Sequence, residues 1–348
     1  MDSTFKKYSI NGPINIVRLE GNGKVLYLMF DVHEEPNFQT RCRDSKNLDV
    51  DQFLDLVFSQ LKSEVDFFIE ANPQVLYNTS LETDTSNLNY ISNTEKWISR
   101  NTKSYPLVRF HHMDFRDYFE HLEFKNIDLI SFCDDFKKIM SKLKSSLTTG
   151  DTQDKSQKQK IINKILLKYS NKKNNETIMK YINEVYLPYL DKGLGYVNKK
   201  VEKMKPKIEL LEYPNDKFYK DGYGIDYKTQ KKINYEIEVF VHKLITKWLD
   251  TFVILTDLYF IRRFIDKDYI KKAILYSGNY HCIHIIQLLV KYFNFKITHA
   301  HYSKISVNEI NKIILNDDTN KPFTLASYLL PPTLYQCSNL FNFPEWFD

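Results

Sequence analysis

Residues 14–36, "INIVRLEGNGKVLYLMFDVHEEP", predict a β-hairpin that ends in a cluster of acidic groups and one histidine. Two β-rich runs flank the Gly-Asn-Gly of positions 21–23, and such a turn between such runs is a strong hairpin signal. The second run is apolar from Val25 to Phe30 and then reaches Asp31 and His33. We therefore expect a buried strand with ionisable side chains at its end.

The next segment extends this strand into a β-α-β unit. "DVDQFLDLVFSQLKSE", at 49–64, has apolar residues at helical spacing, with Asp49 or Asp51 as the N-cap. "VDFFIE", at 65–70, is a short apolar strand that ends at Glu70. A right-handed crossover through the helix predicts that the strands at 24–31 and 65–70 form a parallel pair.

A second unit lies near the other end of the chain, at 272–302: "KAILYSGNYHCIHIIQLLVKYFNFKITHAHY". It predicts a strand over 273–277, a tight turn at Gly278, a helix from about 281 to 292 and a returning strand. A further strand is predicted over 107–113. Residues 78–104 have the Asn, Ser and Thr content of a long loop with at most one short helix.

These elements predict one α/β domain over residues 1–348, with a mixed, mainly parallel central sheet flanked by helices. Its core is expected at 10–141 and 269–310, with a helical insertion at 142–268 and an aromatic C-terminal tail at 325–348. Within the insertion, 176–205 and 229–267 have helical periodicity, whereas the polar stretch 142–175 has the composition of a mobile excursion. The alternative is a core domain plus an independent helical domain.

Composition excludes several classes of protein. The chain has 348 residues, 43% of them hydrophobic, which is enough for a sizeable core. A net charge of +5 is too dilute to indicate nucleic-acid binding. The four cysteines are far apart with no CxxC pair, which favours reduced thiols over a disulfide framework or zinc ribbon. Neither a secretory signal nor a membrane span is evident, so we expect an intracellular, cytoplasmic protein.

Ionisable residues follow the end of several predicted strands. Asp31 and His33 follow the first, Glu70 ends the second, and His281 follows the strand at 273–277. In open α/β sheets ligands bind beyond the carboxyl ends of the strands, so we expect these groups at one end of one sheet, with functional atoms roughly 4 to 8 Å apart. Two imidazoles and a carboxylate fit a divalent transition metal ion or a metal-free general-base pair. The sequence leaves both open.

Four motifs resemble the superfamily of TraB, Tiki, erythromycin esterase and ChaN-like proteins: "FDVH", "VDFFIE", "LYFIRRFI" and "GNYH" between strand and helix. The resemblance covers 24–70 and 255–299. It implies an active centre of His33, Glu70 and His281, with Arg262 or Arg263 at the family's arginine position. Tiki-like members are metal-dependent, esterase-like members activate water and ChaN-like members bind haem. The first motif departs from the family at Phe30, where the family has glycine.

The leading hypothesis is a hydrolase-like protein acting on a small molecule or peptide. His33 and His281 are ligands or bases in it, Glu70 is a ligand or general base, and Asp31 orients a histidine through its second ring nitrogen. The layout of "LYLMFDVH", "VRFHHMDFRD" and "LTDLYFIRRF" also resembles uncharacterised giant-virus proteins. The competing hypothesis is therefore a catalytically inactive structural or interaction protein that kept the fold, with virion partners or copies of itself, in the host cytoplasm or virion.

The remaining motifs point away from a site. His284 is expected to face helix packing, and a local salt-bridged turn is expected at Asp114, Arg116 and Asp117. His111 and His112 point to opposite faces of a strand, so at most one faces the crevice. No Walker loop, HExxH, Gly-x-Ser-x-Gly or dinucleotide-binding glycine motif is present, which removes the best evidence for P-loop ATPases, zincins, serine hydrolases and dinucleotide enzymes.

Overall fold

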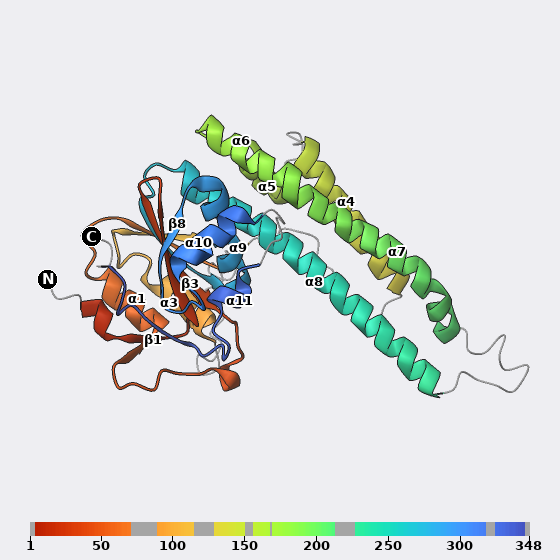
Figure 1. Cartoon of the computed structure of the whole chain (residues 1–348), viewed down its shortest axis with the longest axis horizontal. Coiled ribbons are helices and arrows are strands. Elements are labelled where there is room, and N and C mark those ends of the chain that lie inside the picture. Colours follow the sequence, from red (N-terminus) through yellow and green to blue (C-terminus); the bar gives the residue numbers. More distant parts are fainter. Residues whose placement is uncertain are drawn as a thin grey trace, which may run out of the picture. The chain divides into compact units, whose positions relative to one another are not determined.

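The computed structural model describes residues 4–70, 89–114, 129–149, 156–167, 169–212, 227–317 and 324–344 (Figure 1). The chain divides into two compact units, one made of Met1–Phe115 with Thr256–Asp348 and the other of Arg116–Leu255. The first unit contains the described strands, and the second is helical. This division places the helical unit at 116–255, and the single-domain boundaries expected from the sequence stay a prediction.

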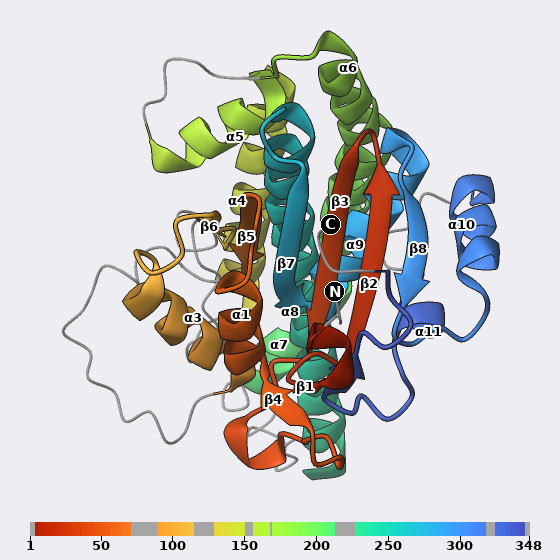
Figure 2. The same ribbon diagram turned by 90° about the vertical axis from the view of Figure 1, so that its left-hand side faces the viewer.

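A six-stranded mixed sheet organises the first unit, in the order β6-β5-β7-β3-β2-β8 (Figure 2). The strands are β6 (Val108–His112), β5 (Val65–Ile69), β7 (Lys272–Gly278), β3 (Lys24–Asp31), β2 (Asn15–Gly21) and β8 (Lys296–Ala300). β6, β5, β7 and β3 run parallel to one another, whereas β2 is antiparallel to both β3 and β8. The α/β class is confirmed, but a mainly parallel sheet is not.

The predicted hairpin is confirmed. β2 pairs with β3 from Asn15↔Phe30 to Gly21↔Lys24, which leaves a two-residue turn. Its residues, Asn22 and Gly23, have φ of 51° and 69°. A two-residue turn with positive φ at both positions matches the right-handed twist of the strands, and Asn-Gly is its preferred sequence.

The predicted parallel pair of strands 24–31 and 65–70 is wrong, because β7 lies between β3 and β5 and pairs with both. The helix between them, α1 (Val50–Phe58), is where the periodicity placed it. In the segment 272–302, α9 (Asn279–Phe293) follows β7. It leads the chain to the edge of the six-stranded sheet where β8 pairs with β2. Every β7 residue after Lys272 is buried, as the centre of a sheet covered on both faces requires.

A small second sheet joins the two ends of the chain, in the order β4-β1-β9. β1 (Ser9–Asn11) pairs with β4 (Asn47–Asp49) in parallel and with β9 (Cys337–Asn339) antiparallel. The aromatic tail then reaches the core, where the ring of Phe343 stacks on that of Tyr27 at 6.1 Å between centroids. The short elements η1 (Thr4–Lys7), η2 (Pro36–Phe38), α10 (Val307–Asn316) and α11 (Ala326–Leu329) complete this part of the unit.

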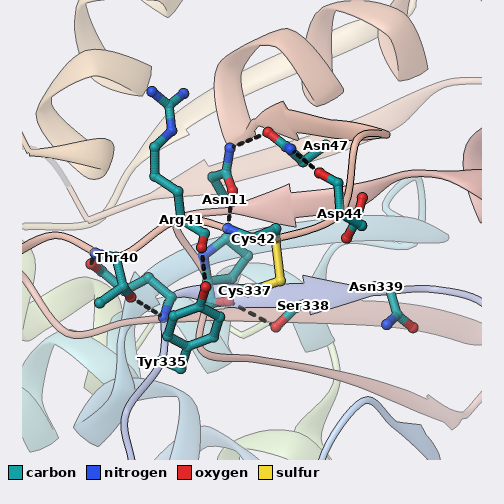
Figure 3. The surroundings of a disulfide bond; sticks show 12 residues. Asn11, Thr40, Arg41, Cys42, Asp44, Asn47, Tyr335, Cys337, Ser338 and Asn339 are labelled. Atoms are coloured by element: carbon teal, nitrogen blue, oxygen red, sulfur yellow. Dashed lines mark hydrogen bonds between the residues drawn. A yellow bond between two sulfur atoms is a disulfide. The ribbon is translucent and has the colours of Figure 1, made fainter.

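The expectation of four reduced thiols is wrong, because Cys42 and Cys337 form a disulfide across 295 positions of sequence (Figure 3). Cys133 and Cys282 are buried and form no disulfide. The pairing of β1 with β9 brings Cys337 beside Asn11, whose side chain accepts a hydrogen bond from the backbone of Cys42. The spacing of the cysteines in the sequence does not indicate that Cys42 and Cys337 are in contact.

One face of the large sheet is covered by α1 and α3 (Tyr90–Asn101). The core there is rich in aromatic rings, and Phe58 makes edge contacts with Phe67, Tyr105 and Phe110. Residues 71–88 of the expected long loop lie outside the described residues. The rest of that loop is α3, with Asn89 as its N-cap.

The helical unit contains α4 (Leu129–Thr149), α5 (Gln157–Leu167), α6 (Lys172–Tyr181), the π-helical η5 (Ile182–Tyr186), α7 (Leu187–Glu212) and most of α8 (Tyr227–Asp266). The long helices predicted from periodicity are confirmed. The described part of the polar stretch 142–175 is largely helical rather than an excursion, because Leu143, Leu147, Ile162 and Ile165 bury an apolar stripe. Among the described helices, none combines the length and apolar character of a membrane span.

Candidate functional site

Three neighbouring parallel strands end at the same edge of the large sheet. β3 ends in Asp31, with His33 two residues on. β5 is followed by Glu70, and β7 ends at Gly278, from which α9 begins and carries His281 in its first turn. A parallel sheet places its carboxyl ends together, which explains why residues so distant in sequence meet.

Glu70 is the centre of the cluster. Its Oε2 accepts hydrogen bonds from the Gly278 backbone at 2.7 Å and the Ser277 hydroxyl at 3.0 Å, and lies 3.3 Å from His33 Nε2. Its Oε1 lies 3.3 Å from His281 Nε2. The carboxylate is 5% exposed and joins both histidines. The expected residues therefore meet at one sheet edge, with neighbouring functional atoms 3.3 Å apart rather than the roughly 4 to 8 Å expected, and their roles stay predictions.

His33 is held from its other side by Asp31. The His33 Nδ1 lies 2.7 Å from Asp31 Oδ2, and the His33 backbone N–H donates to the same oxygen at 2.6 Å. Tyr276 donates its hydroxyl to Asp31 Oδ1 at 2.8 Å. His33 has φ of +51°, in the left-handed region that non-glycine residues occupy rarely and that recurs at functional sites.

His281 is held by Asp257, a residue that sequence reasoning missed. Asp257 on α8 binds His281 Nδ1 through Oδ1 at 2.6 Å and His284 Nδ1 through Oδ2 at 2.7 Å. The expectation that His284 only faces helix packing is thus incomplete. Asp257 is fully buried in the apolar stretch "VILTDLYFI", and an acid inside such a run was the available signal.

Exposure separates His33 from the other residues of this network. The His33 side chain is 42% exposed, whereas those of Asp31, Glu70, His281, Asp257 and His284 are all buried. Of the network's imidazoles and carboxylates, His33 is therefore the group that a dissolved molecule can reach.

The neighbouring acids hold His33 in its charged form. Burial by itself lowers the pKa of His33, but the hydrogen bonds to Asp31 and Glu70 and the charges of these two acids outweigh it and raise the pKa to about 10. At neutral pH the ring is an imidazolium.

Glu70 and His281 stabilise each other's charges in the same way. Desolvation raises the pKa of Glu70, but the charges and hydrogen bonds of His281 and His33 hold it well below its usual range. Desolvation likewise lowers the pKa of His281, yet Glu70 and Asp257 raise it well above the ordinary value. A buried carboxylate thus lies between two cationic rings.

Gly278 leaves the space in which this contact forms. A Cβ at position 278 would lie 2.8 Å from His33 Nε2 and 3.1 Å from Glu70 Oε2. Any larger residue meets both partners, so the His33–Glu70 contact depends on this missing side chain. The turn into α9 does not, because the φ of −54° at Gly278 is open to any residue.

The model of a family of unknown function, DUF5847, matches residues 8–144 and 122–348. The chain belongs to this family. Among its relatives are three uncharacterized proteins of Acanthamoeba polyphaga mimivirus. R160 is 29% identical, and the match covers 100% of this chain and 98% of R160. R706 is 27% identical, and the match covers 97% of both chains; R161 is 29% identical, and the match covers 97% of this chain and 98% of R161. No solved structure matches. The resemblance to giant-virus proteins is confirmed, and the one to the TraB, Tiki and esterase superfamily is not.

A metal at His33, Glu70 and His281, one of the two alternatives that the sequence left open, stays a prediction. Among the described His, Cys, Asp and Glu side chains, one group brings three donor atoms within 4.8 Å of one another, and it is Cys42, Asp44 and Cys337. His33, Glu70 and His281 instead form a row with the carboxylate in the middle. As they lie, these three side chains do not make the compact ligand set of a single ion.

The remaining predicted residues lie elsewhere or stay predictions. Burial lowers the pKa of His111, and the charge of Arg263, on α8, lowers it further. His111 and Arg109 bind the fully buried Asp66 near the start of β5. Arg262 is half-buried on the same helix and keeps its expected role as a prediction only. Of the expected turn, Arg116 and Asp117 lie outside the described residues.

Proposed function

We propose that this chain is a hydrolase-like enzyme in which His33 is the acid–base group. The observation that carries the proposal is the continuous row Asp31–His33–Glu70–His281–Asp257, in which every carboxylate contacts an imidazole and only His33 is exposed. Networks that shift pKa values strongly and open to solvent at one group are typical of catalytic sites.

Each member of the row has a distinct part in this proposal. Asp31 fixes the ring of His33 through Nδ1. A substrate oxygen takes the place of Glu70, which lies 3.3 Å from His33 Nε2, and Nε2 then exchanges protons with the substrate. The imidazolium stabilises negative charge on a substrate oxygen and donates its Nε2 proton to the leaving group. Water adds to the other fragment and returns one proton to Nε2, which balances the hydrolysis.

Glu70 acts in this scheme as an anionic support rather than as the base. It is buried, accepts hydrogen bonds on both oxygens and has a pKa well below its usual range, so it is a weak proton acceptor. His281, fixed by Asp257, holds the second oxygen of Glu70. A small ester or peptide substrate is proposed from the superfamily resemblance alone.

The test is turnover of a panel of p-nitrophenyl esters and fluorogenic peptides. We expect hydrolysis by the wild type, loss of at least ~100-fold in His33→Gln, in line with the contribution of general acid–base groups, and no change in His242→Gln. His242 is an exposed histidine of α8 in the helical unit. Equal rates in both variants would reject His33 as the acid–base group.

The same test includes a measurement of bound metal. Elemental analysis of the purified wild type and of His281→Ala separates a metal-dependent centre from a metal-free one. A stoichiometric transition metal that is lost in His281→Ala would replace the acid–base proposal with a metal site.

The second proposal is a viral protein without catalysis that keeps the fold. It is supported by the comparisons, whose matched relatives are uncharacterised giant-virus proteins, and by Phe30 at the position of the superfamily's glycine. In this case the buried row stabilises the sheet edge only. A wild type that hydrolyses nothing in the panel, while His281→Ala lowers stability, would favour it.

A further inference from the structure

We propose that Cys42 and Cys337, once reduced, bind a thiophilic divalent cation such as Zn²⁺, with Asp44 as the third protein ligand. The two sulfurs and a carboxylate oxygen of Asp44 lie within 4.8 Å of one another. Figure 3 shows the three side chains around the disulfide. Zinc bonds thiolates at about 2.3 Å and carboxylates at about 2.0–2.2 Å, so a tetrahedral site needs ligand atoms roughly 3.5 Å apart. Opening the sulfur–sulfur bond and rotating the side chains meets this requirement.

The backbone holds the two cysteines together without the disulfide. Cys337 pairs with Asn11 across the β1–β9 ladder, and the Asn11 side-chain oxygen accepts from the Cys42 backbone at 2.7 Å. Thr40 lies two residues before Cys42, and Gln336 lies one residue before Cys337. The Thr40 backbone donates to the Gln336 side chain at 3.0 Å, and the Gln336 backbone donates to the Thr40 hydroxyl at 2.7 Å. The Cα atoms are 5.1 Å apart. Reduction therefore leaves two adjacent thiols rather than two separated ends.

Asp44 is fixed by the turn that carries it. Its Oδ1 accepts from the Lys46 backbone at 3.0 Å, and its carbonyl accepts from the Asn47 side chain. Asp44 is exposed, Cys337 is half-buried and Cys42 is buried. An ion held here has its fourth position on the solvent side, where water completes a tetrahedron.

The disulfide and the metal exclude each other chemically. A phosphine reductant supplies two electrons, the sulfur–sulfur bond breaks, and the phosphine becomes a phosphine oxide with the oxygen of one water molecule, whose two protons make two thiols. The cation then displaces these two protons and binds the thiolates. Soft sulfur ligands select zinc or a similar ion over magnesium and calcium.

Cobalt titration tests the site, because Co²⁺ bound by thiolates gives an intense near-ultraviolet charge-transfer band. Full-length protein is titrated with CoCl₂ under anaerobic conditions, before and after reduction by a phosphine that is then removed. We expect one equivalent to bind the reduced protein with the band, and no band in the oxidised protein. Asp44→Asn should weaken binding roughly 10-fold or more, as loss of a metal-site partner does. Excess Zn²⁺ should abolish the band.

Matched variants identify the ligands. Cys42→Ser/Cys337→Ser should lose the band, whereas Cys133→Ser and His33→Gln should retain it, because neither residue belongs to the cluster. Circular dichroism of each variant checks that it is folded. The proposal is overturned if the reduced wild type shows no band, if the double serine variant keeps it while folded, or if Cys133→Ser or His33→Gln abolishes it.

Discussion

At the scale of single residues, the attraction between opposite charges sets the protonation states of the histidines and of Glu70 in the site. Burial alone drives imidazoles and carboxylates toward their neutral forms, yet both rings that face Glu70 have raised pKa values and Glu70 has a lowered one. Each group is therefore charged because its neighbour is. Removing one member changes the protonation of the others.

The pH dependence of stability follows from these directions. The pKa of His33 rises from 6.5 to about 10 on folding, so its contribution is complete below 6.5 and is lost as the pH rises toward 10. Glu70 acts in the opposite direction: its contribution is complete above 4.5 and is lost in acid. We expect urea midpoints to fall between pH 6.5 and 10 in the wild type, with a flatter curve in His33→Gln. An equally steep fall in the variant would contradict the pKa assignment.

Gly278→Ala tests the His33–Glu70 contact. The added methyl group meets His33 Nε2 at 2.8 Å, and the exposed imidazole is the partner that can yield. We expect His33 to leave Glu70, so its pKa should fall from about 10 toward 6.5 in an NMR titration. Gly193→Ala, where the methyl group meets nothing within 4 Å, is the control and should leave this pKa unchanged. A pKa still near 10 in Gly278→Ala would mean that the contact survives.

At the scale of elements, the C-terminal end of α8 supplies a residue to the site that the ends of the strands form. Residues 256–266 of this helix belong to the α/β unit and pack on the sheet, as the edge contact of Phe260 with Phe68 shows. The same part of α8 carries Asp257, whose carboxylate contacts two histidines of α9, His281 and His284. The helix therefore fixes α9 through a buried acid in addition to apolar packing.

Asp257→Asn tests this link. The substitution keeps the size of the side chain but removes the charge between two imidazoles, and breaking a buried ion pair on one side costs about 3–5 kcal/mol. We expect a loss of this size in the free energy of urea unfolding. Asp268→Asn, on the exposed segment just after α8, should change it by about 0.5 kcal/mol or less. A similar small effect in both variants would show that Asp257 is dispensable.

At the scale of the whole molecule, the two ends of the chain close the fold of the α/β unit. β9 joins β1, and the disulfide links the loop after β3 to the C-terminal segment. That loop carries His33 near its start. Farther along it, Thr40, Arg41 and Cys42 bind Gln336, Tyr335 and Cys337 in turn. The C-terminal segment therefore anchors the far end of the loop that carries the exposed histidine.

Reduction of the disulfide should destabilise the chain. A cross-link over 295 positions restricts the unfolded ensemble strongly, and such a bond typically contributes about 2–4 kcal/mol. We expect a lower urea midpoint in the presence of a phosphine reductant, measured with a chelator to exclude metal binding. Cys42→Ser/Cys337→Ser should be as unstable as the reduced wild type and insensitive to the reductant. A wild type that reductant leaves unchanged would show that the bond is absent or without effect.

The sequence by itself determined the local elements and the residue types of the site. Short apolar runs, period-3.6 apolar patterns and the Asn-Gly turn placed β2, β3, β5, β7, α1 and α9, since these signals depend on neighbours along the chain. The rule that strand ends converge was enough to bring Asp31, His33, Glu70 and His281 together.

Only the tertiary structure decided strand order, the disulfide and the full network. β7 separates β3 from β5, Cys337 meets Cys42, and Asp257 reaches His281 and His284, all through contacts between distant segments. Local propensity is silent about such pairings, because their free energy comes from burial and hydrogen bonding that exist only once the sheet has formed. For the same reason the charges of the site became apparent only when the acids and histidines lay within 3.3 Å of each other.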